Sequence, residues 1–360
     1  MNLATLGWNP FFDQHFNGCR SQGLSPARVA REYGQSYLVL CEHGELSAQV
    51  SGKLRHSALE RSDLPAVGDW VAIQPRLDEG KATIHAVLPR KSSFSRKVAG
   101  AITEEQIVAA NVDTVFLVSG LDSDFNVRRI ERYLTLAWDC GAVPVIVLNK
   151  ADLCAEVEAH VAEVESIAFG VPVYPISAKE KRGLTVLHQY LKLGETVALL
   201  GSSGVGKSTL INSLLGVEHR RVGSVREFDG KGRHVTTHRE LVLLPEGGML
   251  IDNPGMRELQ MWGSDEGLAE TFDDIGDLAA GCRFSDCRHD SEPGCAIRAA
   301  LDDGTLDQAR FRSYLKLQRE VRYVESRRDQ KERLAEREKW KKLGKWGRNR
   351  QKLRKRGLVR

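Results

Sequence analysis

The sequence lacks any apolar run that approaches the length of a membrane span, and its N-terminus lacks a basic segment followed by an apolar one. Its seven cysteines are an odd number, and no secretory segment accompanies them. These absences argue against a membrane protein and against a disulfide framework. We therefore expect a cytoplasmic protein with no membrane partner, and its 360 residues are enough for two or three domains.

A glycine-rich loop for phosphate binding occupies residues 201–208, where the sequence reads Gly-Ser-Ser-Gly-Val-Gly-Lys-Ser. In this spacing, backbone N–H groups of a tight loop face the α- and β-phosphates, and Lys207 reaches the β/γ oxygens. A buried strand is predicted over residues 195–200, and residues 210–215 continue as a helix whose N-terminus attracts phosphate. We assign magnesium binding to Ser208. The predicted phosphate-binding residues are Gly201, Ser202, Ser203, Gly204, Val205, Gly206, Lys207, Ser208 and Thr209.

An acidic motif follows at residues 248–255, where an apolar strand ends in Asp-Asn-Pro-Gly. Taken alone, this tetrapeptide is an ordinary turn sequence. It comes 45 residues after Lys207, with a strand-like segment at residues 240–244 between them. We therefore predict that Asp252 holds magnesium, usually through water, and that the Gly255 N–H senses the γ-phosphate.

A base-reading motif lies upstream, where an apolar strand over residues 144–148 ends in Asn-Lys-Ala-Asp. A carboxylate there accepts from both N1–H and the exocyclic amine of guanine, and adenine offers no such pair of donors. A second strand, over residues 171–176, leads into a Ser-Ala-Lys loop that backs the guanine carbonyl. The predicted guanine-binding residues are Asn149, Lys150, Ala151, Asp152, Ser177, Ala178 and Lys179.

The order of these motifs predicts a circularly permuted GTPase. Ordinary GTPases place the phosphate loop first, whereas here both base-reading motifs precede it. Ligands gather at the carboxyl ends of the strands in an open α/β sheet whatever the chain order, so the site survives the permutation. The segment after Gly255 then leaves the core for a separate domain, and a γ-phosphate-dependent shift could pass directly into that domain.

Three cysteines and one histidine in fourteen residues predict a closed tetrahedral zinc site. Four protein ligands leave no open position for a catalytic water, so we favour structural zinc over both catalytic zinc and scattered buried cysteines. The predicted ligands are Cys282, Cys287, His289 and Cys295.

The region before the GTPase motifs reads as short strands separated by glycine-containing turns, which suits a small β-barrel of OB type. The predicted strands cover residues 36–41, 46–50, 69–73 and 81–87. Residues 1–34 read as a poorly ordered arm because their aromatic residues stand among Gly, Asn and Gln. The arm aromatics, which dock either on a partner or on the barrel, are Trp8, Phe11, Phe12 and Phe16.

The C-terminal segment is strongly basic. Residues 326–360 hold sixteen Lys or Arg and four acidic residues, although the whole chain has a formal charge of only +4. Trp340 and Trp346 are interleaved with the charges. Such a tail neutralises phosphates and binds RNA without sequence preference. A solubilising disordered tail is the alternative reading.

The chain carries four features in a fixed order: a predicted β-barrel, a permuted GTPase core, a Cys-x4-Cys-x-His-x5-Cys motif and a basic tail. With this order it resembles the ribosome small-subunit-dependent GTPase A family. The resemblance covers roughly residues 36–325. It implies a zinc domain after the GTPase core and a role in late maturation of the small ribosomal subunit. It also implies GTP hydrolysis stimulated by that subunit, with the subunit and its rRNA as partners.

The switch segment departs from the family pattern of Arg-His followed by three threonines, because Val235 replaces the first threonine. Either Thr236 or Thr237 therefore supplies the magnesium-binding hydroxyl. Met256 follows Asp-x-x-Gly, where many GTPases carry a water-orienting Gln. We expect slow turnover without a partner, and His234 is the candidate for polar assistance; a histidine that only packs against rRNA is equally compatible with the sequence.

The sequence thus predicts a multidomain α/β protein that binds one structural zinc ion and uses magnesium with GTP. We expect a GTP hydrolase that acts as a monomer on the small ribosomal subunit, with Lys207, Asp252, Gly255 and His234 as its catalytic residues. A nucleotide-gated rRNA-binding checkpoint, in which hydrolysis only triggers release, is the alternative; a signalling GTPase is more distant. The predicted units are residues 1–35 (arm), 36–100 (OB-type barrel), 101–262 (permuted P-loop GTPase), 263–325 (α-rich zinc domain) and 326–360 (basic tail).

Overall fold

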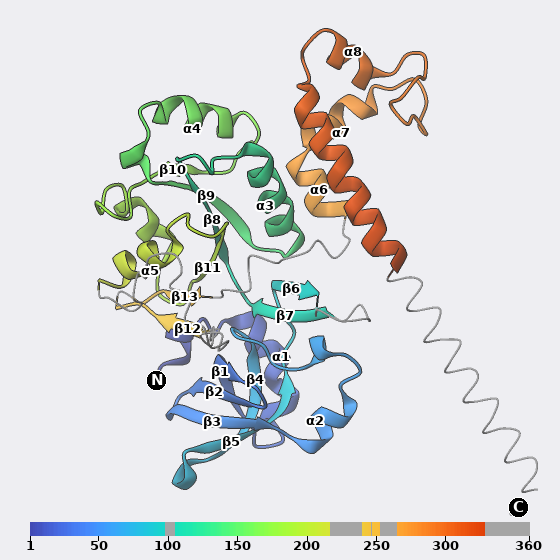
Figure 1. Cartoon of the computed structure of the whole chain (residues 1–360). Helices are drawn as coiled ribbons and strands as arrows, with labels where there is room; N and C mark the ends of the chain where they lie inside the picture. Colours follow the sequence, from blue (N-terminus) through green and yellow to red (C-terminus); the bar gives the residue numbers. More distant parts are fainter. Residues whose placement is uncertain (98–104, 217–239, 246, 253–264, 328–360) are drawn as a thin grey trace, which may run out of the picture.

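The computed structural model describes residues 1–97, 105–216, 240–245, 247–252 and 265–327. Along the chain, a β-barrel is followed by an α/β core and then by a group of helices that carries the predicted zinc ligands (Figure 1). Among the described residues, no helix has the length and apolar character needed to cross a bilayer. The predicted site residues that fall outside the described part are His234, Thr236, Thr237 and Gly255.

The N-terminal barrel consists of five strands that close on themselves. They are β1 (Ser25–Tyr33), β2 (Ser36–Cys41), β3 (Gly44–Val50), β4 (Trp70–Arg76) and β5 (Lys81–Val87). Their spatial order is β1-β2-β3-β5-β4 with β4 pairing back onto β1, and β3 and β5 run parallel. Alternate residues, including Val29, Val39 and Ile84, fill the interior. This order is that of a five-stranded OB-type barrel, so the predicted fold of this region is confirmed.

Residues 1–34 do not form the poorly ordered arm that we expected. They contain the short helix η1 (Leu3–Leu6), the helix α1 (Pro10–Arg20) and the first barrel strand, β1. Asn9 caps α1 by accepting from the Phe11 N–H, and Pro10 occupies the first turn. The prediction failed because Phe12 and Phe16 stand four residues apart, which gives α1 an apolar face despite its polar neighbours, and Trp8 just before the helix packs beside them.

The apolar face of α1 packs on the barrel. Phe12 and Phe16 are only 2% and 1% exposed. The ring of Trp8 lies 4.7 Å from that of Trp70 at the start of β4, and the ring of Phe12 lies 5.8 Å from it. Of the two roles that we considered for these aromatics, the structure therefore supports docking on the barrel.

The α/β core is a mostly parallel sheet with helices on both faces. Its strands are β8 (Thr114–Gly120), β9 (Val143–Asn149), β10 (Val173–Pro175), β11 (Thr196–Leu200), β12 (Glu240–Leu243) and β13 (Met249–Asp252). They lie in the order β10-β9-β8-β11-β13-β12, and only the edge strand β12 is antiparallel to its neighbour β13. The helical segments are α3 (Val127–Asp139), η4 (Ala151–Leu153), α4 (Val157–Glu165), η5 (Thr185–Tyr190) and α5 (Lys207–Leu215).

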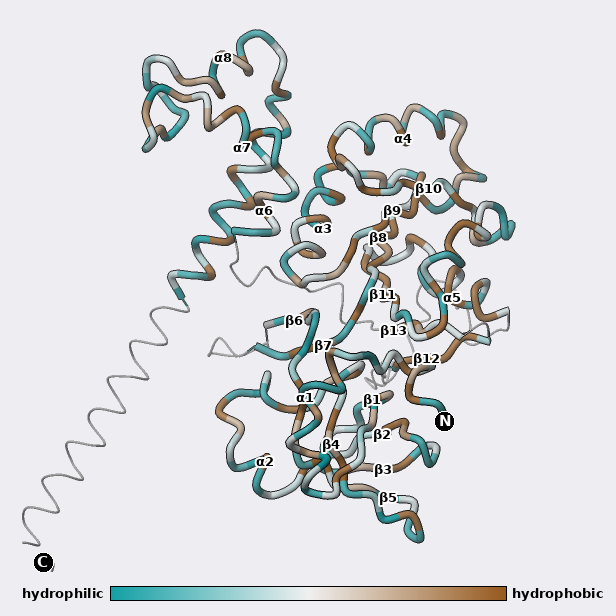
Figure 2. Tube along the Cα trace, turned by 180° about the vertical axis from the view of Figure 1, so that it is seen from behind, coloured by the Kyte–Doolittle hydropathy of each residue, from teal (hydrophilic) through white to brown (hydrophobic). Residues whose placement is uncertain are grey.

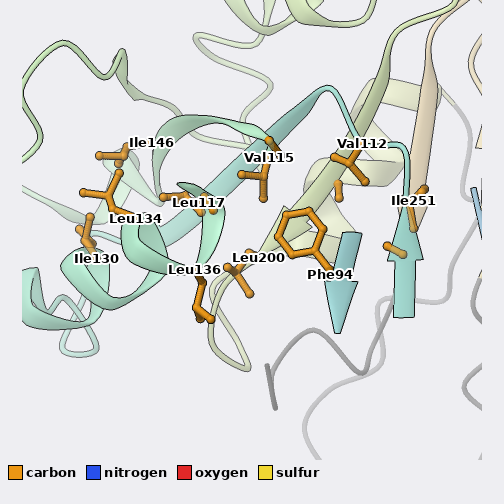
Figure 3. Packing of buried hydrophobic residues seen from close by; sticks show 14 of the residues in the cluster. Phe94, Val112, Val115, Leu117, Ile130, Leu134, Leu136, Ile146, Leu200 and Ile251 are labelled. Carbon is orange, nitrogen blue, oxygen red and sulfur yellow. The ribbon is translucent and has the colours of Figure 1, made fainter. Parts of the chain in front are cut away.

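The strands of this sheet are continuously apolar because both of their faces are covered. On one face Leu117 and Ile146 pack with Ile130 and Leu134 of α3 (Figure 3). The residues on the other face pack with Leu210 and Ile211 of α5 and with Leu187 of η5. They include Phe116, Val118, Val147 and Leu199. Viewed from behind, hydrophobic residues follow β8 and β9 in the middle of the sheet (Figure 2).

The barrel and the core share one continuous sheet. Edge strand β12 of the core pairs antiparallel with β1 of the barrel, where Arg31 also forms an ion pair with Glu240. The buried side chain of Arg28 joins the same units: it donates to the carbonyls of Leu6 and Gly68, and, at 3.0 Å and 2.8 Å, to Asn111 O and Thr196 Oγ1. Burial lowers the pKa of Arg28 to about 10.

A two-stranded ribbon, β6 (Ser93–Lys97) and β7 (Glu105–Ala110), lies between barrel and core. Phe94 of this ribbon is fully buried. Arg90, which precedes the ribbon, forms a bidentate ion pair with Asp69 in which both N···O distances are 2.8 Å. The side chains of Arg90 and Phe94 therefore hold this part of the chain in place by an ion pair and by burial. The segments between the barrel strands include α2 (Gly52–Ser57), η2 (Arg61–Asp63) and η3 (Leu77–Glu79).

The C-terminal unit is helical, as predicted. Its elements are α6 (Asp265–Thr271), α7 (Asp273–Ala280), α8 (Ala296–Asp302) and a helix over residues 308–327. This unit packs on the side of the core where α3 lies (Figure 1). The predicted fold class, an OB-type barrel, an α/β core and an α-rich unit with a Cys/His cluster, is confirmed.

Candidate functional site

The predicted nucleotide-binding motifs converge at one edge of the core sheet. Because β8, β9, β10, β11 and β13 are parallel, their carboxyl ends meet at the same edge. The Asn-Lys-Ala-Asp motif follows β9, the Ser-Ala-Lys loop follows β10, the phosphate loop follows β11, and Asp252 ends β13. Motifs separated by up to about 100 residues of sequence are therefore neighbours, as ligand binding at this edge requires.

The phosphate loop makes a tight turn that only glycine fits at two positions. Gly206 has a φ of +95°, and a Cβ on it would collide with the side-chain amide of Asn149. A Cβ on Gly201 would collide with the Val118 carbonyl. The loop brings Lys207 to the start of α5, where its Nζ donates to the carbonyls of Gly201 and Ser202, each at 2.6 Å. The ammonium group is thereby held at the mouth of the loop.

Asn149 joins the base-reading half to the phosphate half. Its side chain is only 3% exposed. Its Nδ2 donates to the Val205 carbonyl in the phosphate loop at 2.8 Å, and its Oδ1 accepts from the Ala178 N–H at 2.9 Å. Ser213 of α5 adds a second connection, since its Oγ donates to the Ala178 carbonyl at 2.9 Å. One buried amide thus fixes the spacing between two loops that are distant in sequence.

The remaining base-reading residues face the open edge of the site. Lys150 adopts a φ of +66°, and its Nζ contacts Asp122 Oδ2 at 2.6 Å. A hydrogen bond from Ser177 lowers the pKa of Asp152, so this carboxylate is ionised at neutral pH. An ionised carboxylate that is partly open to solvent can accept two hydrogen bonds from a base edge. Lys179 is exposed beside it.

Sequence reasoning missed three residues of this edge, Asp122, Asp124 and Arg129. Asp124 Oδ2 accepts from Arg129 Nη1 at 2.6 Å and from Ser202 Oγ at 2.9 Å, and Arg129 Nη1 also lies 2.7 Å from Ser202 Oγ. The contact with Arg129 lowers the pKa of Asp124, and the contact with Lys150 lowers that of Asp122. Both acids follow β8, a further strand of the same sheet, but no short motif in the sequence marks them.

Two candidate magnesium ligands lie at this edge. Ser208 is in the first turn of α5, and Asp252 ends β13, which pairs in parallel with β11. A hydroxyl and a carboxylate are oxygen donors of the kind that magnesium prefers. The predicted threonine ligand, His234 and Gly255 belong to the part of the chain that the structure does not describe.

The four predicted zinc ligands form a compact cluster between α7 and α8. Their ligand atoms all lie within 4.8 Å of one another. Cys282 Sγ is 3.6 Å from His289 Nδ1 and 4.0 Å from Cys295 Sγ, and the latter is 3.5 Å from His289 Nδ1. Donor atoms around a tetrahedral zinc ion with Zn–S bonds of ~2.3 Å are separated by about 3.8 Å. The donor set and its spacing therefore fit zinc.

The metal-free thiols of this cluster differ in pKa. Burial raises the pKa of the Cys287 thiol to about 11, whereas the pKa of Cys282 is lowered, against its burial, by hydrogen bonds from the backbone N–H groups of Ala296 and Ile297 and by contacts with the neighbouring thiols. His289 is held at a φ of +62°, and Cys295 is buried at the N-terminus of α8. The other four cysteines, which lie in α1, in β2 and in the α/β core, are separate from this cluster.

Comparisons with known proteins agree with this geometry. A family model described as RsgA GTPase matches residues 87–262. The small ribosomal subunit biogenesis GTPase RsgA of Opitutus terrae is 51% identical over 352 residues, which cover 95% of this chain and 96% of that protein. The protein of the same name from Syntrophotalea carbinolica is 51% identical over 329 residues, with 89% and 90% covered.

Solved structures support the same fold. The crystal structure of YjeQ from Thermotoga maritima matches with a TM-score of 0.62 at 30% identity, over 83% of this chain and 98% of that chain. The structure of YloQ, described as a circularly permuted GTPase, matches with a TM-score of 0.60 over 83% of this chain and 95% of that chain. At 23% identity, this second likeness concerns the fold alone. The circular permutation predicted from the motif order is confirmed.

Proposed function

The chain belongs to the RsgA GTPase family, and from this premise we propose that it hydrolyses GTP on the small ribosomal subunit and assists late maturation of that subunit in the cytoplasm. The observation that carries the nucleotide part is the position of Asn149, whose amide ties the phosphate loop to the Ser-Ala-Lys loop. The ribosomal part rests on the names of relatives that are about half identical over nearly the whole chain.

In this proposal each half of the site has its own task. Asp152 accepts from N1–H and the exocyclic amine of guanine, while the Lys150 stem covers the ring. The Ser177–Lys179 loop backs the guanine carbonyl. The backbone N–H groups of residues 201–209 surround the phosphates, and Lys207 neutralises charge on the β/γ oxygens. Catalysis then follows from positioning and electrostatic stabilisation.

Magnesium, when bound with the nucleotide, supplies positive charge that stabilises the phosphate oxygens. Ser208 and either Thr236 or Thr237 would hold it directly, and Asp252 would hold it through water. The cluster of Cys282, Cys287, His289 and Cys295 would bind one zinc ion with a structural role, because four protein ligands leave no position for substrate.

Turnover by the isolated protein is expected to be slow. Met256 stands where many GTPases carry a glutamine, and its thioether cannot orient the attacking water as an amide does. In our proposal the small ribosomal subunit completes the site, with His234 as the candidate polar group and Gly255 as the contact to the γ-phosphate. A His234→Ala variant that retained full stimulated turnover would remove His234 from this role.

The test is GTP turnover by the zinc-loaded protein with and without purified small ribosomal subunits. Strong stimulation that is confined to GTP, absent with ATP and lost in Lys207→Ala supports the proposal. Lys192→Ala, which removes an exposed lysine before β11, is the matched control and should behave as wild type. Absence of stimulation in an intact, nucleotide-binding protein would contradict it.

The absence of glutamine after Asp-x-x-Gly also favours a second candidate, a nucleotide-gated rRNA-binding checkpoint in which hydrolysis only triggers release. The checkpoint alternative predicts that the affinity for small subunits differs between GDP and a non-hydrolysable GTP analogue while turnover is not stimulated. Measuring subunit affinity beside turnover therefore separates the two functions.

A further inference from the structure

Helix α3 lies between the phosphate loop and the C-terminal zinc-binding unit, and its first residues contact both. Asn126 caps the helix by accepting from the Arg129 N–H at 3.0 Å. The side chain of Arg129 extends to the phosphate loop, those of Arg128, Glu131 and Arg132 extend to the zinc-binding unit, and Ile130 between them packs on the core sheet. These five residues span only about 6 Å of helix, so a small tilt or rotation of this turn moves all of them together.

On the side of the nucleotide site, Arg129 is connected to Lys207 through Ser202. Its Nη1 lies 2.7 Å from Ser202 Oγ, and Asp124 Oδ2 contacts both groups, at 2.6 Å and 2.9 Å. The main chain of Ser202 in turn accepts from Lys207 Nζ at 2.6 Å. Asp124 and Arg129 thus hold the side chain of a phosphate-loop residue whose carbonyl helps hold the ammonium group.

On the other side, neighbouring residues of α3 hold the helix over residues 308–327. Arg128 Nη2 contacts Asp307 Oδ2 at 2.5 Å, just before that helix. Arg132 forms a bidentate ion pair with Glu320, in which Nη1 lies 2.5 Å from Oε2 and Nη2 lies 2.6 Å from Oε1. Such paired contacts between planar groups fix orientation as well as distance.

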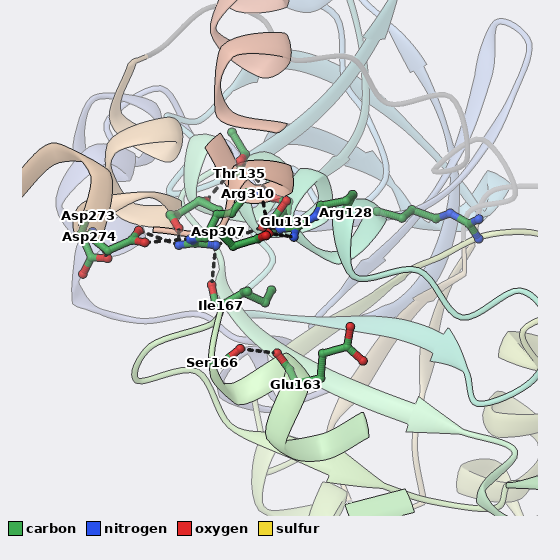
Figure 4. Close-up of polar contacts among 12 residues, drawn as sticks. Arg128, Glu131, Thr135, Glu163, Ser166, Ile167, Asp273, Asp274, Asp307 and Arg310 are labelled. Carbon is green, nitrogen blue, oxygen red and sulfur yellow. Dashed lines mark hydrogen bonds and ion pairs between the residues drawn. The ribbon is translucent and has the colours of Figure 1, made fainter. Parts of the chain in front are cut away.

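A buried network anchors this interface (Figure 4). Glu131 of α3 has no exposed surface, and its Oε1 accepts from Arg310 Nη1 at 3.0 Å. Arg310 also contacts Asp274 of α7, at 2.6 Å and 2.8 Å, and the Thr271 carbonyl at the end of α6 at 3.1 Å. Three helices of the zinc-binding unit are thereby attached to one turn of α3.

We propose that α3 couples the seating of the zinc-binding unit to the geometry of the phosphate loop, with Arg129 as the positioning residue. When residues 128 and 132 are held by the C-terminal helix, the Arg129 guanidinium is aimed at Ser202. When that hold loosens, the turn relaxes and the loop loses its external support. The coupling rests on the nucleotide site proposed above.

The main variant is the double substitution Asp307→Asn/Glu320→Gln. It removes the ion pairs of Arg128 and Arg132, leaves the buried pair of Glu131 and Arg310 in place, and keeps similar side-chain shapes. The amide oxygen of the introduced asparagine can still accept the hydrogen bond that Asp307 Oδ2 receives from the Arg310 N–H at 2.9 Å. Glu325→Gln, a neutralisation at a half-buried position of the same helix, is the matched control. Arg129→Lys keeps the charge of Arg129 but loses its planar fork.

The experiment measures dissociation of a fluorescent GDP analogue and hydrogen exchange of residues 201–207 on the zinc-loaded chain, without ribosomal subunits. Circular dichroism and zinc content verify folding, and Glu320→Gln alone serves if the double variant is unstable. We expect dissociation to accelerate about 3- to 10-fold in the double variant and in Arg129→Lys, with faster exchange in the loop. The variant with all three substitutions should release the GDP analogue little faster than the double variant does, because all three substitutions act on the same chain of contacts.

Unchanged dissociation and exchange in the double variant would overturn the coupling, whatever Arg129→Lys does. Independent effects that multiply in the triple variant would also overturn it, as would an equal effect of Glu325→Gln. Failure of the wild-type chain to bind GDP at all would instead contradict the proposed nucleotide site. The two failures are therefore distinguishable.

Discussion

At the scale of single residues, the candidate site depends on side chains that each connect two loops. Asn149 spans the phosphate loop and the Ser-Ala-Lys loop, and Lys150 is tied to the loop after β8 through Asp122. The sequence predicted Asn149 and Lys150 because a short motif carries them. Asp122 has no such motif, and its role follows only from which strands lie side by side, which is a non-local property.

Base selection is the first prediction at this scale. Asp152→Asn replaces two carboxylate acceptors by one acceptor and one donor, so the exocyclic amine of guanine loses its partner. We expect GTP affinity to fall by about 100-fold or more, while xanthosine triphosphate, which carries a carbonyl there, binds better than to wild type. Competition binding with both nucleotides measures the change. Equal losses for both nucleotides would show that Asp152 acts only in folding.

Ionisation of the site gives the second prediction. Hydrogen bonds from Ser177, Lys150 and Arg129 lower the pKa values of Asp152, Asp122 and Asp124 respectively. A carboxylate whose pKa is lowered in the folded site stabilises that site fully at any pH above its ordinary pKa. This stabilisation is lost only as the pH falls through the lowered pKa. Affinity for guanosine, which lacks the phosphate groups that titrate near pH 6, should therefore be flat from about pH 8 to about pH 5 and fall only near pH 4 or below. A midpoint near pH 6 would point to a histidine instead.

At the scale of elements, continuous apolar strands made the core predictable, whereas the N-terminal helix and β1 were not recognised. Strand β1 reads as a poor strand because Arg28 interrupts it, and only the folded molecule provides the carbonyls that satisfy that buried guanidinium. The pairing of β12 with β1 was also unforeseen, since it joins strands that are more than 200 residues apart.

Helix α1 supplies a stability prediction for this element. Phe12→Ala removes a ring that is 2% exposed and contacts Trp70, so the free energy of unfolding should fall by about 3–5 kcal/mol. Gln14→Ala, on the exposed side of the same helix, should change it by no more than about 0.5 kcal/mol. Urea unfolding followed by tryptophan fluorescence measures both. Equal stability of the two variants would mean that α1 docks weakly.

At the scale of the whole molecule, burial joins all three units, and the continuous sheet joins the barrel and the core. One apolar cluster includes Trp70 of the barrel, Phe94 of the ribbon, Leu117 and Ile130 of the core, and Phe272 of the zinc-binding unit. The sequence predicted the units separately because each has a local pattern. Their packing was not predictable, since it depends on polar networks such as that of Arg310 and Glu131, whose members look like ordinary surface charges in the sequence.

Zinc removal tests how the last unit depends on its metal. Residues 281–295 between α7 and α8 contain no regular element, so four metal bonds would replace the missing core in holding this loop. Cys287→Ser should abolish bound zinc and accelerate hydrogen exchange throughout residues 265–302, while Cys154→Ser, in the GTPase core, should retain one zinc per chain. Elemental analysis and exchange mass spectrometry measure both effects.

Because Arg310 is attached to Glu131 through contacts outside the metal cluster, we expect residues 308–327 to stay protected from hydrogen exchange longest when zinc is removed. Simultaneous loss of protection in that helix and the zinc loop would show that the metal, and not the buried network, holds this unit on α3.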